Sequence, residues 1–308
     1  MNEPNVPLVV GPTAVGKTEL ALLIAERLGA EIVSADSRQI YKFMDIGTAK
    51  PTADELARVP HHFIDIRTPD QYYSAGEYGR EARRRIEQLF RNRTMPLVVG
   101  GSGFYIRALV DGLFAPKVTD PEVKEKWRQR IRQEGKEVIF RFLAQVDPDT
   151  AQRLHVNDTQ RVVRALEVWE MTGKPISAFQ EGEETPAPFH PLFFGLVRKR
   201  DHLYARIEQR VDQMIADGLV AEVESLHAMG YDPRLNALRT VGYREVFDYL
   251  AGLLSYDAMI DTIKMNTRRY AKRQLTWFRK DARIRWLDLD RHPKDHIVET
   301  IVKAVTEA

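Results

Sequence analysis

The sequence contains no cysteine among its 308 residues. Disulfide bonds, thiolate nucleophiles and cysteine-ligated zinc sites are therefore excluded. It also lacks any apolar run near the roughly 20 residues that a bilayer-crossing helix needs. The first residues, MNEPNVP, lack the basic and apolar parts of a signal peptide. We therefore expect a cytoplasmic protein with no membrane attachment.

Net charge is also small, at +2, which on its own says nothing about nucleic acid. The charge is unevenly distributed, because residues 264–285 hold nine basic residues and one acidic residue. With 44% hydrophobic and 29% charged residues, the composition is that of an ordinary globular protein. A chain of this length can form two cores, or one core that carries an insertion.

The N-terminal third alternates apolar strand patterns with helical patterns. Strands are expected at 6–10, 31–34 and 95–99, and helices at 18–28 and 76–91. This β-α-β rhythm predicts a parallel sheet with helices on both faces. We expect the strand at 31–34 to lie beside the strand at 6–10.

The pattern changes in the middle of the chain. Residues 119–190 contain no strand-like run. Asp120-Pro121 and Asp147-Pro148 are helix start signals, and Gly173 is a stop signal. The sequence therefore predicts an all-helical insertion domain over 119–190.

The segments on either side of this insertion are expected to form one core, 1–118 together with 191–308. A strand at 192–197 leads back into that core. Helical patterns then fill the C-terminal region, apart from one short strand near 284–287.

A glycine-rich segment, GPTAVGKT, stands between the first strand and the first helix. It matches the G-x-x-x-x-G-K-[ST] pattern of a phosphate-binding loop, or P-loop. Its N–H groups and the helix N-terminus form an anion nest, Lys17 adds a charge, and the Thr18 hydroxyl can bind Mg²⁺. We therefore expect an α/β fold, a P-loop NTPase-like parallel sheet flanked by helices. The loop residues are Gly11, Pro12, Thr13, Ala14, Val15, Gly16, Lys17 and Thr18.

Enzymes that hydrolyse nucleotides usually carry an acidic metal ligand at the end of another apolar strand. The strand at 95–99 ends instead in Gly100-Gly101-Ser102, without a carboxylate. The nearest candidate is Asp36, which follows the strand at 31–34. By its pattern, Asp36 is a metal ligand, a general base or the cap of a helical turn.

Two helical segments carry arginines and lysines in a pattern that suits phosphate. Residues 267–280, TRRYAKRQLTWFRK, interleave cations with aromatic residues. Cations neutralise a phosphate backbone and aromatic rings stack on unpaired bases, so RNA is one candidate ligand. A solvated basic helix with a buried aromatic seam is the alternative. On the helix that begins near His202, Arg206 and Arg210 lie one turn apart and either reach the P-loop phosphates or stay in solvent.

Taken in order, seven segments resemble the tRNA dimethylallyltransferases, also called tRNA isopentenylpyrophosphate transferases, over nearly the whole chain. They are GPTAVGKT, DSRQIYKFMDIGTAKP, PHHFIDI, LVVGGSGFYI, DTQRVVRALEVWEMTGKPIS, LRTVGYREVFDYL and TRRYAKRQLTWFRK. The resemblance implies transfer of a dimethylallyl group from dimethylallyl diphosphate to N6 of the adenosine 3′ to the tRNA anticodon (position 37). The products implied are N6-isopentenyladenosine and diphosphate. Mg²⁺ is the implied cofactor, the anticodon stem-loop the implied partner, and no protein partner is implied.

The same resemblance assigns roles to individual residues. It makes Asp36 the general base on the adenine amino group, Arg210 a contact of the diphosphate, and Ser102 a hydroxyl near the reacting centre. Lys17 and Thr18 complete the catalytic set. Contacts with tRNA are expected from Asp36, Ser37, Arg38, Gln39, Gln160, Arg161, Val162, Val163, Arg164, Arg239, Thr240, Val241, Gly242, Tyr243, Arg244, Lys272, Arg273, Gln274, Leu275, Thr276, Trp277, Phe278 and Arg279.

The chain departs from the family pattern at a few positions. Ser102 stands where the family usually has Thr, which keeps the hydroxyl, and Val15 stands where it often has Ser, which does not. Without cysteine there is no zinc-finger extension of the eukaryotic kind, so the chain resembles the compact bacterial form. A P-loop small-molecule kinase and an RNA-binding ATPase are the alternatives. The basic-aromatic stretch at 267–280 disfavours the kinase, and nucleotide or ATP binding would rest on the loop motif alone.

Overall fold

The computed structural model describes residues 3–112, 118–179 and 186–307. The chain divides into two compact units, one formed by Met1–Val110 with Ala187–Ala308 and the other by Asp111–Pro186. We call them the core unit and the insertion unit. The part of the predicted insertion at 180–185 lies outside the described residues.

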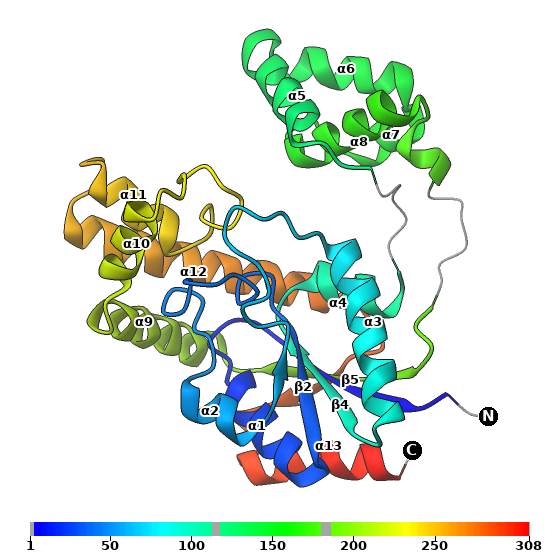
Figure 1. Cartoon of the computed structure of the whole chain (residues 1–308), viewed down its shortest axis with the longest axis vertical. Helices are drawn as coiled ribbons and strands as arrows, with labels where there is room; N and C mark the ends of the chain where they lie inside the picture. The colour runs from blue at the N-terminus through cyan, green and yellow to red at the C-terminus, as the bar shows by residue number, and fades with distance from the viewer. Residues whose placement is uncertain (1–2, 113–117, 180–185, 308) are drawn as a thin grey trace. The chain divides into compact units, whose positions relative to one another are not determined.

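A six-stranded parallel sheet forms the centre of the core unit, in the order β3-β2-β4-β1-β5-β6. Figure 1 shows β2, β4 and β5 of this sheet with helices around them. The predicted α/β fold with a parallel sheet is therefore confirmed. The strands are β1 Asn5–Val10, β2 Ala30–Ala35, β3 His61–His62, β4 Met95–Gly100, β5 His190–Val197 and β6 Arg285–Asp288.

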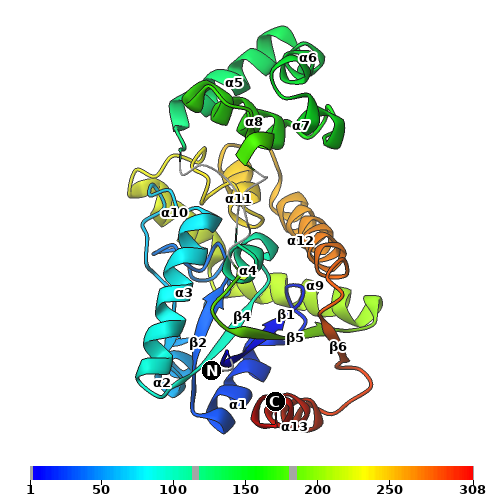
Figure 2. The same cartoon turned by 90° about the vertical axis from the view of Figure 1, so that its right-hand side faces the viewer.

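Helices cover both faces of this sheet because alternate residues of each strand face opposite sides. In β1, Leu8 and Val10 pack in one apolar cluster with α3 and α4, whereas Val9 packs in the other with α1 and α13. In both views α1 and α13 lie side by side (Figures 1 and 2). These helices are α1 Lys17–Leu28, α3 Ala75–Arg91, α4 Gly103–Val110 and α13 Lys294–Thr306.

Four helices, α9 to α12, lie between β5 and β6 in the chain, and one short helix, α2, follows β2. The long helix α12 packs against α9 and α11. The short elements α2 and β3 were not among the segments predicted from the sequence. The bounds are α2 Ala53–Arg58, α9 Arg200–Ala216, α10 Leu219–Ala228, α11 Tyr243–Leu250 and α12 Tyr256–Phe278.

The order of the strands corrects one expectation. β4 lies between β1 and β2, so the strand before Asp36 is not beside the P-loop strand. The crossover through α1 passes over the neighbouring position, and β4 fills it. Ala35 pairs with Gly100, and Gly100 with Val10. A Cβ on Gly100 would lie 2.2 Å from the Ala35 carbonyl oxygen, so glycine permits this approach. The turns after β2, β4 and β1 therefore meet at one sheet edge.

Every secondary-structure element in the described residues of the insertion unit is a helix, and its core includes Trp127, Leu143 and Leu166. The sequence signals mark its helix ends. Asp120 caps α5 by accepting a hydrogen bond from the Glu122 N–H at 2.8 Å, and Gly173 ends α8 in a left-handed conformation, with φ of 69°. Its elements are α5 Pro121–Glu134, α6 Lys136–Val146, α7 Pro148–Arg153, α8 Thr159–Thr172 and a 3-10 helix, Ile176–Phe179.

Candidate active site

The P-loop connects β1 to α1 and leaves the start of the helix open. Ala14 and Gly16 have left-handed backbones, with φ of 62° and 115°. Gly16 is the N-cap of α1, and no side chain caps the helix there. Two arginines support the loop: Arg206 Nε donates to the Ala14 carbonyl and Arg198 Nε to the Val15 carbonyl, each at 2.9 Å. The N–H groups at the start of α1 can therefore bind an anion.

The Lys17 side chain folds back over its own loop. Its Nζ donates to the carbonyl oxygens of Gly11 and Pro12, at 3.0 and 2.8 Å. Burial lowers the pKa of the Lys17 ammonium to about 8, the Asp36 carboxylate opposes this shift, and Arg210 adds to it. An incoming phosphate would raise this pKa again and would compete with the two carbonyls for the ammonium protons.

Asp36 lies in the turn that follows β2. Its Oδ1 accepts hydrogen bonds from the N–H groups of Arg38 and Gln39, at 2.8 and 3.4 Å. Among the described residues nothing donates to Oδ2, so one oxygen fixes the turn and the other is available to a substrate. The nearby Tyr270 hydroxyl has its pKa raised to about 12, mainly by burial and then by the Asp36 charge.

Ser102 joins the turn after β4 to the turn that carries Asp36. Its Oγ accepts from the Ser37 N–H at 2.9 Å and donates to Ser37 Oγ at 3.2 Å. The Ser102 side chain is buried, whereas Ser37 is half-buried. The hydroxyl thus holds the residue next to Asp36 in place.

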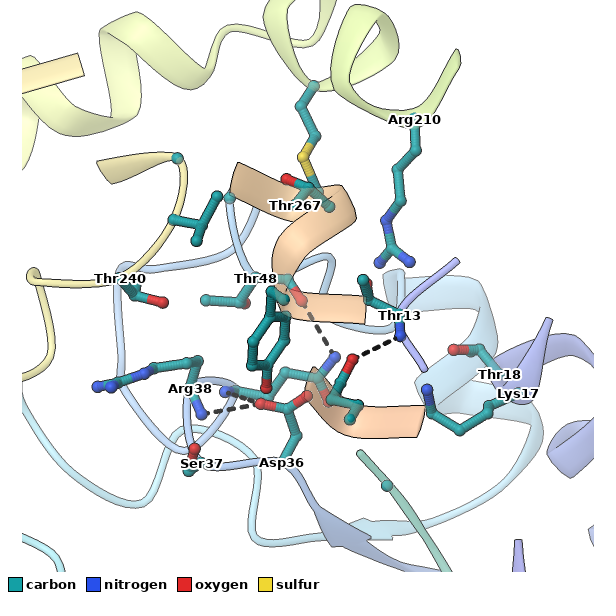
Figure 3. A pocket seen from close by; sticks show the side chains of 18 of the residues that line it. Thr13, Lys17, Thr18, Asp36, Ser37, Arg38, Thr48, Arg210, Thr240 and Thr267 are labelled. Carbon is teal, nitrogen blue, oxygen red and sulfur yellow. Dashed lines mark hydrogen bonds between the residues drawn. The ribbon is translucent and has the colours of Figure 1, made fainter. Parts of the chain in front are cut away.

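A pocket of about 510 Å³ brings the two halves of the predicted site together. Lys17 and Thr18 line it from the P-loop, Asp36 from the turn after β2, and Arg210 from α9. Figure 3 shows the Arg210 guanidinium reaching from α9 toward the loop, on the same side of the pocket as Thr13 and Thr18. Burial holds the pKa of Arg210 below its ordinary value, with Asp36 opposing and Arg206 reinforcing the shift. Ser102 lines a neighbouring pocket of about 400 Å³ instead.

Arg38 and Gln39, which follow Asp36, line the pocket and also form hydrogen bonds to other segments of the chain. Arg38 donates from one guanidinium nitrogen to the Asn236 carbonyl at 2.8 Å. Gln39 Nε2 donates to the Ala49 carbonyl at 2.9 Å and to that of Thr48 at 3.3 Å. Gln39 therefore fixes the segment that forms another wall of the pocket.

The candidate tRNA residues on α12 fall into two groups. Lys272, Arg273, Thr276 and Arg279 are exposed, and Leu275 and Trp277 are half-buried. Gln274 and Phe278 are buried, at 7% and 2% exposure. For these two, a side-chain contact with tRNA does not fit the structure, because their face of the helix packs against the core unit.

The cations of this helix also differ in their partners. Lys264 pairs with Asp212 at 2.6 Å and Arg268 with Glu208 at 2.5 Å, both on α9. Among the described residues, three α12 cations and Arg279, which follows the last residue of α12, form no ion pair, and they are the ones open to an external phosphate. These are Arg269, Lys272, Arg273 and Arg279.

The segment 239–244 divides in the same way. Arg239 and Arg244 are exposed, Thr240 and Val241 are half-buried, and Gly242 is buried. Tyr243 was expected to contact tRNA. Its side chain is fully buried, so it does not reach an RNA surface.

In the insertion unit, Gln160 and Arg161 are exposed on α8, whereas Val162 and Val163 belong to the apolar core. Because both valine side chains lie in the core, they offer no side-chain contact to tRNA. Arg164 donates to the Val118 carbonyl at 2.8 Å and to Glu167 Oε2 at 2.6 Å, so it braces the start of the unit.

Sequence reasoning missed Glu222, which shapes a wall of the 510 Å³ pocket. Its carboxylate accepts hydrogen bonds from the N–H groups of Asp45, Ile46 and Gly47, at 2.8, 2.7 and 3.2 Å. No local pattern could have identified this contact, because 175 residues separate Gly47 from Glu222.

Within residues 3–112, 118–179 and 186–307, no cluster of three His, Asp or Glu side chains is placed to hold a metal ion. Over the same residues, no helix has the length and apolar character that a membrane span requires.

Comparison with known proteins identifies relatives over nearly the whole chain. The model of the IPP transferase family matches residues 39–281. The tRNA dimethylallyltransferase of Pelotomaculum thermopropionicum is 48% identical over 92% of this chain and 90% of its own length. That of Thermotoga petrophila is 44% identical, over 98% of both chains.

Solved structures agree with this result. The tRNA isopentenylpyrophosphate transferase of Bacillus halodurans superposes with a TM-score of 0.72 at 36% identity, over 99% of this chain and 98% of that chain. A eukaryotic dimethylallyltransferase acting on tRNA gives a TM-score of 0.82 at 26% identity, over 99% of this chain and 80% of that chain.

Proposed function

The chain belongs to the IPP transferase family, and on that premise we propose that it prenylates the adenosine 3′ to the anticodon of tRNA. It is a transferase, and the relatives favour tRNA dimethylallyl transfer over a small-molecule kinase or an RNA-binding ATPase. The donor is dimethylallyl diphosphate, and the products are N6-isopentenyladenosine and diphosphate.

One observation carries the proposal: a single pocket is lined by a phosphate-binding loop and by a carboxylate outside that loop. The P-loop supplies Lys17 and Thr18, and the turn after β2 supplies Asp36. Cations of 239–244 and α12 line the same pocket. A diphosphate donor and a base on RNA can therefore meet between the loop and Asp36.

The P-loop half binds the leaving group. Negative charge develops on the diphosphate oxygens as the C1–O bond of the donor breaks, and N–H groups, Lys17 and Arg210 stabilise that charge. A Mg²⁺ ion would neutralise part of the same charge. The donor set fits this ion, because Mg²⁺ keeps several waters and binds substrate phosphates with few protein ligands, here the Thr18 hydroxyl.

The Asp36 half prepares the nucleophile. An exocyclic amine is a weak nucleophile because its lone pair is delocalised into the adenine ring. As N6 forms a bond to C1 of the donor, Asp36 takes a proton from N6, and the electron pair of the broken C1–O bond leaves with diphosphate. Asp36 Oδ2, to which none of the described residues donates, is suited to that proton.

The acceptor must leave the anticodon loop to reach this pocket. Unpaired loop bases can be turned out and enclosed by a protein, at a cost of a few kcal/mol in lost stacking. The exposed cations Lys272 and Arg273 on α12, with Arg279 at its C-terminal end, would hold the RNA backbone during this step.

The test is incubation of the protein with unmodified tRNA and dimethylallyl diphosphate, without ATP. Prenylated adenosine in the nucleoside mass spectrum is the expected result. A strict need for ATP would indicate the kinase instead. RNA-stimulated phosphate release without prenylated product would indicate the ATPase.

A further inference from the structure

Gln274 lies on α12, but its side chain is buried, although the motif predicts a contact with tRNA. Its neighbours Lys272 and Arg273 are exposed, but the Gln274 side chain is only 7% exposed. A buried amide must find partners within the protein, since an unpaired polar group in the interior costs about 1–3 kcal/mol. The partners of this amide belong to the two halves of the active site.

Both polar atoms of the amide are used. Oε1 accepts a hydrogen bond from the Thr13 N–H of the P-loop at 2.9 Å. Nε2 donates to the Gly101 carbonyl, in the turn after β4, also at 2.9 Å. A Cβ on Gly101 would lie 2.3 Å from Nε2, so the glycine makes room for the amide.

The Gln274 amide is connected through Gly101 to the Asp36 half of the site. Gly101 precedes Ser102, whose Oγ accepts from the Ser37 N–H at 2.9 Å, and Ser37 follows Asp36. One planar amide thus connects the loop that binds the leaving group to the turn that carries the base. Pairing through β4 spaces the ends of β1 and β2, and the amide joins the turns that lie beyond those strand ends.

We propose that Gln274 is a positioning residue that fixes the spacing between the P-loop and the Asp36 turn, rather than a contact of tRNA. The inference rests on the proposed prenyl transfer. A displacement near 1 Å of reacting groups can reduce a rate about 100-fold, so the bridge would act on turnover. Gln274 lines the active-site pocket but adds little to the exposed face of α12 that carries Lys272 and Arg273, so its loss would leave RNA affinity nearly unchanged.

The first test replaces the amide by an apolar side chain of similar length, Gln274→Met. We expect kcat to fall about 10-fold to 100-fold while the tRNA dissociation constant changes by less than about twofold. Gln88→Met is the matched control, because Gln88 is exposed on α3 and lies outside the site. It should behave as the unaltered protein.

The second test uses Gln274→Glu and its pH dependence. An ionised carboxylate still accepts from the Thr13 N–H but cannot donate to the Gly101 carbonyl. A protonated carboxyl group can do both. The kcat of Gln274→Glu divided by that of the unaltered protein should therefore rise as the pH falls, because pH effects common to both proteins cancel in the ratio.

The outcomes separate the possible roles. A raised tRNA dissociation constant with unchanged kcat in Gln274→Met would make Gln274 an RNA contact and overturn the inference. A lowered melting temperature with unchanged kcat would make it a purely structural residue, which also overturns it. If the unaltered protein gives no prenylated adenosine, the proposed function itself fails.

Discussion

The hydroxyl of Tyr243 on α11 donates to Glu222 Oε1 on α10 at 2.6 Å. The same carboxylate accepts from three successive N–H groups, those of Asp45, Ile46 and Gly47. A Cβ on Gly47 would lie 2.4 Å from the Tyr243 ring, so the loop and the ring are in direct contact. The segment 45–47, part of the wall of the 510 Å³ pocket, is therefore fixed to the segment that carries Arg239 and Arg244.

Glu222→Gln should weaken this wall, because the amide nitrogen cannot accept from the loop N–H groups. Hydrogen bonds to a charged group contribute about 1.5–3 kcal/mol each to stability, so urea denaturation should show a loss near that size. The KM for the donor should rise while tRNA affinity stays nearly constant. Glu224→Gln, an exposed change on the same helix, is the control. Equal KM values in the two variants would contradict a role for the wall in donor binding.

Lys17 should make donor binding depend on pH. With a pKa of about 8, the ammonium is charged below that value and neutral above it in the free protein. If only the charged form binds diphosphate well, the affinity of the unaltered protein relative to Lys17→Met should fall about tenfold between about pH 7 and about pH 9. Calorimetric titration with inorganic diphosphate measures this affinity. The protonation of diphosphate itself also changes with pH, but it is the same for both proteins and cancels in the ratio. A flat ratio would argue against charged Lys17 as a ligand.

The same group affects stability with a definite sign. The folded pKa lies below the unfolded value, so the unfolded chain binds more protons between the two. The contribution of Lys17 to stability therefore rises as the pH increases from about 8 toward the unfolded pKa. Lys17→Met should remove that rise, which pH-dependent melting curves can detect.

Asp36→Asn should separate catalysis from folding of the turn. The Asn oxygen can still accept from the N–H groups of Arg38 and Gln39, so the turn should persist. Turnover should fall by roughly two to four orders of magnitude, the usual scale for loss of a general base. Single-turnover prenylation and tRNA binding are the measurements. Near-normal turnover would remove Asp36 from that role.

Ser102 should be replaceable by Thr but not by Ala. Ser102→Ala leaves the Ser37 N–H without its acceptor, at a cost of about 1–3 kcal/mol, and releases the residue beside Asp36. We expect a kcat reduced at least about tenfold in Ser102→Ala and nearly unchanged in Ser102→Thr. Similar kcat values for the two variants would show that the hydroxyl is dispensable.

The unpaired cations of α12 should account for part of the salt dependence of tRNA binding. Each phosphate contact contributes about 0.7–0.9 to the slope of log affinity against log salt. Lys272→Ala and Arg279→Ala should each lower that slope by about this amount. Lys264→Ala is the matched control on the same helix, because Lys264 already pairs with Asp212. An equal change in all three would mean that only net charge matters.

Much of the fold follows from local patterns in the sequence. The P-loop needs left-handed residues at fixed positions and a helix immediately after them, and GPTAVGKT encodes both. Asp120 and Gly173 mark helix ends because a cap and a left-handed stop are properties of a few neighbouring residues. The parallel sheet follows from alternating short apolar runs and helices.

Other features depend on residues far apart in the chain. The position of β4 between β1 and β2 was not predicted, since the strand order reflects how crossovers pack rather than any single segment. The inward orientation of Gln274 and the grip of Glu222 on residues 45–47 likewise depend on partners distant in sequence.

The phosphate-binding loop, several helix ends and the family follow from the sequence alone, because each is encoded in contiguous residues or in the order of motifs. Only the tertiary structure decided which motif residues face solvent and which face the core. Lys272 and Gln274 belong to one basic motif, yet the helix exposes the first and buries the second against the P-loop. The physical reason is the helical period, which turns neighbouring residues to different surroundings, while the rest of the fold determines what those surroundings are.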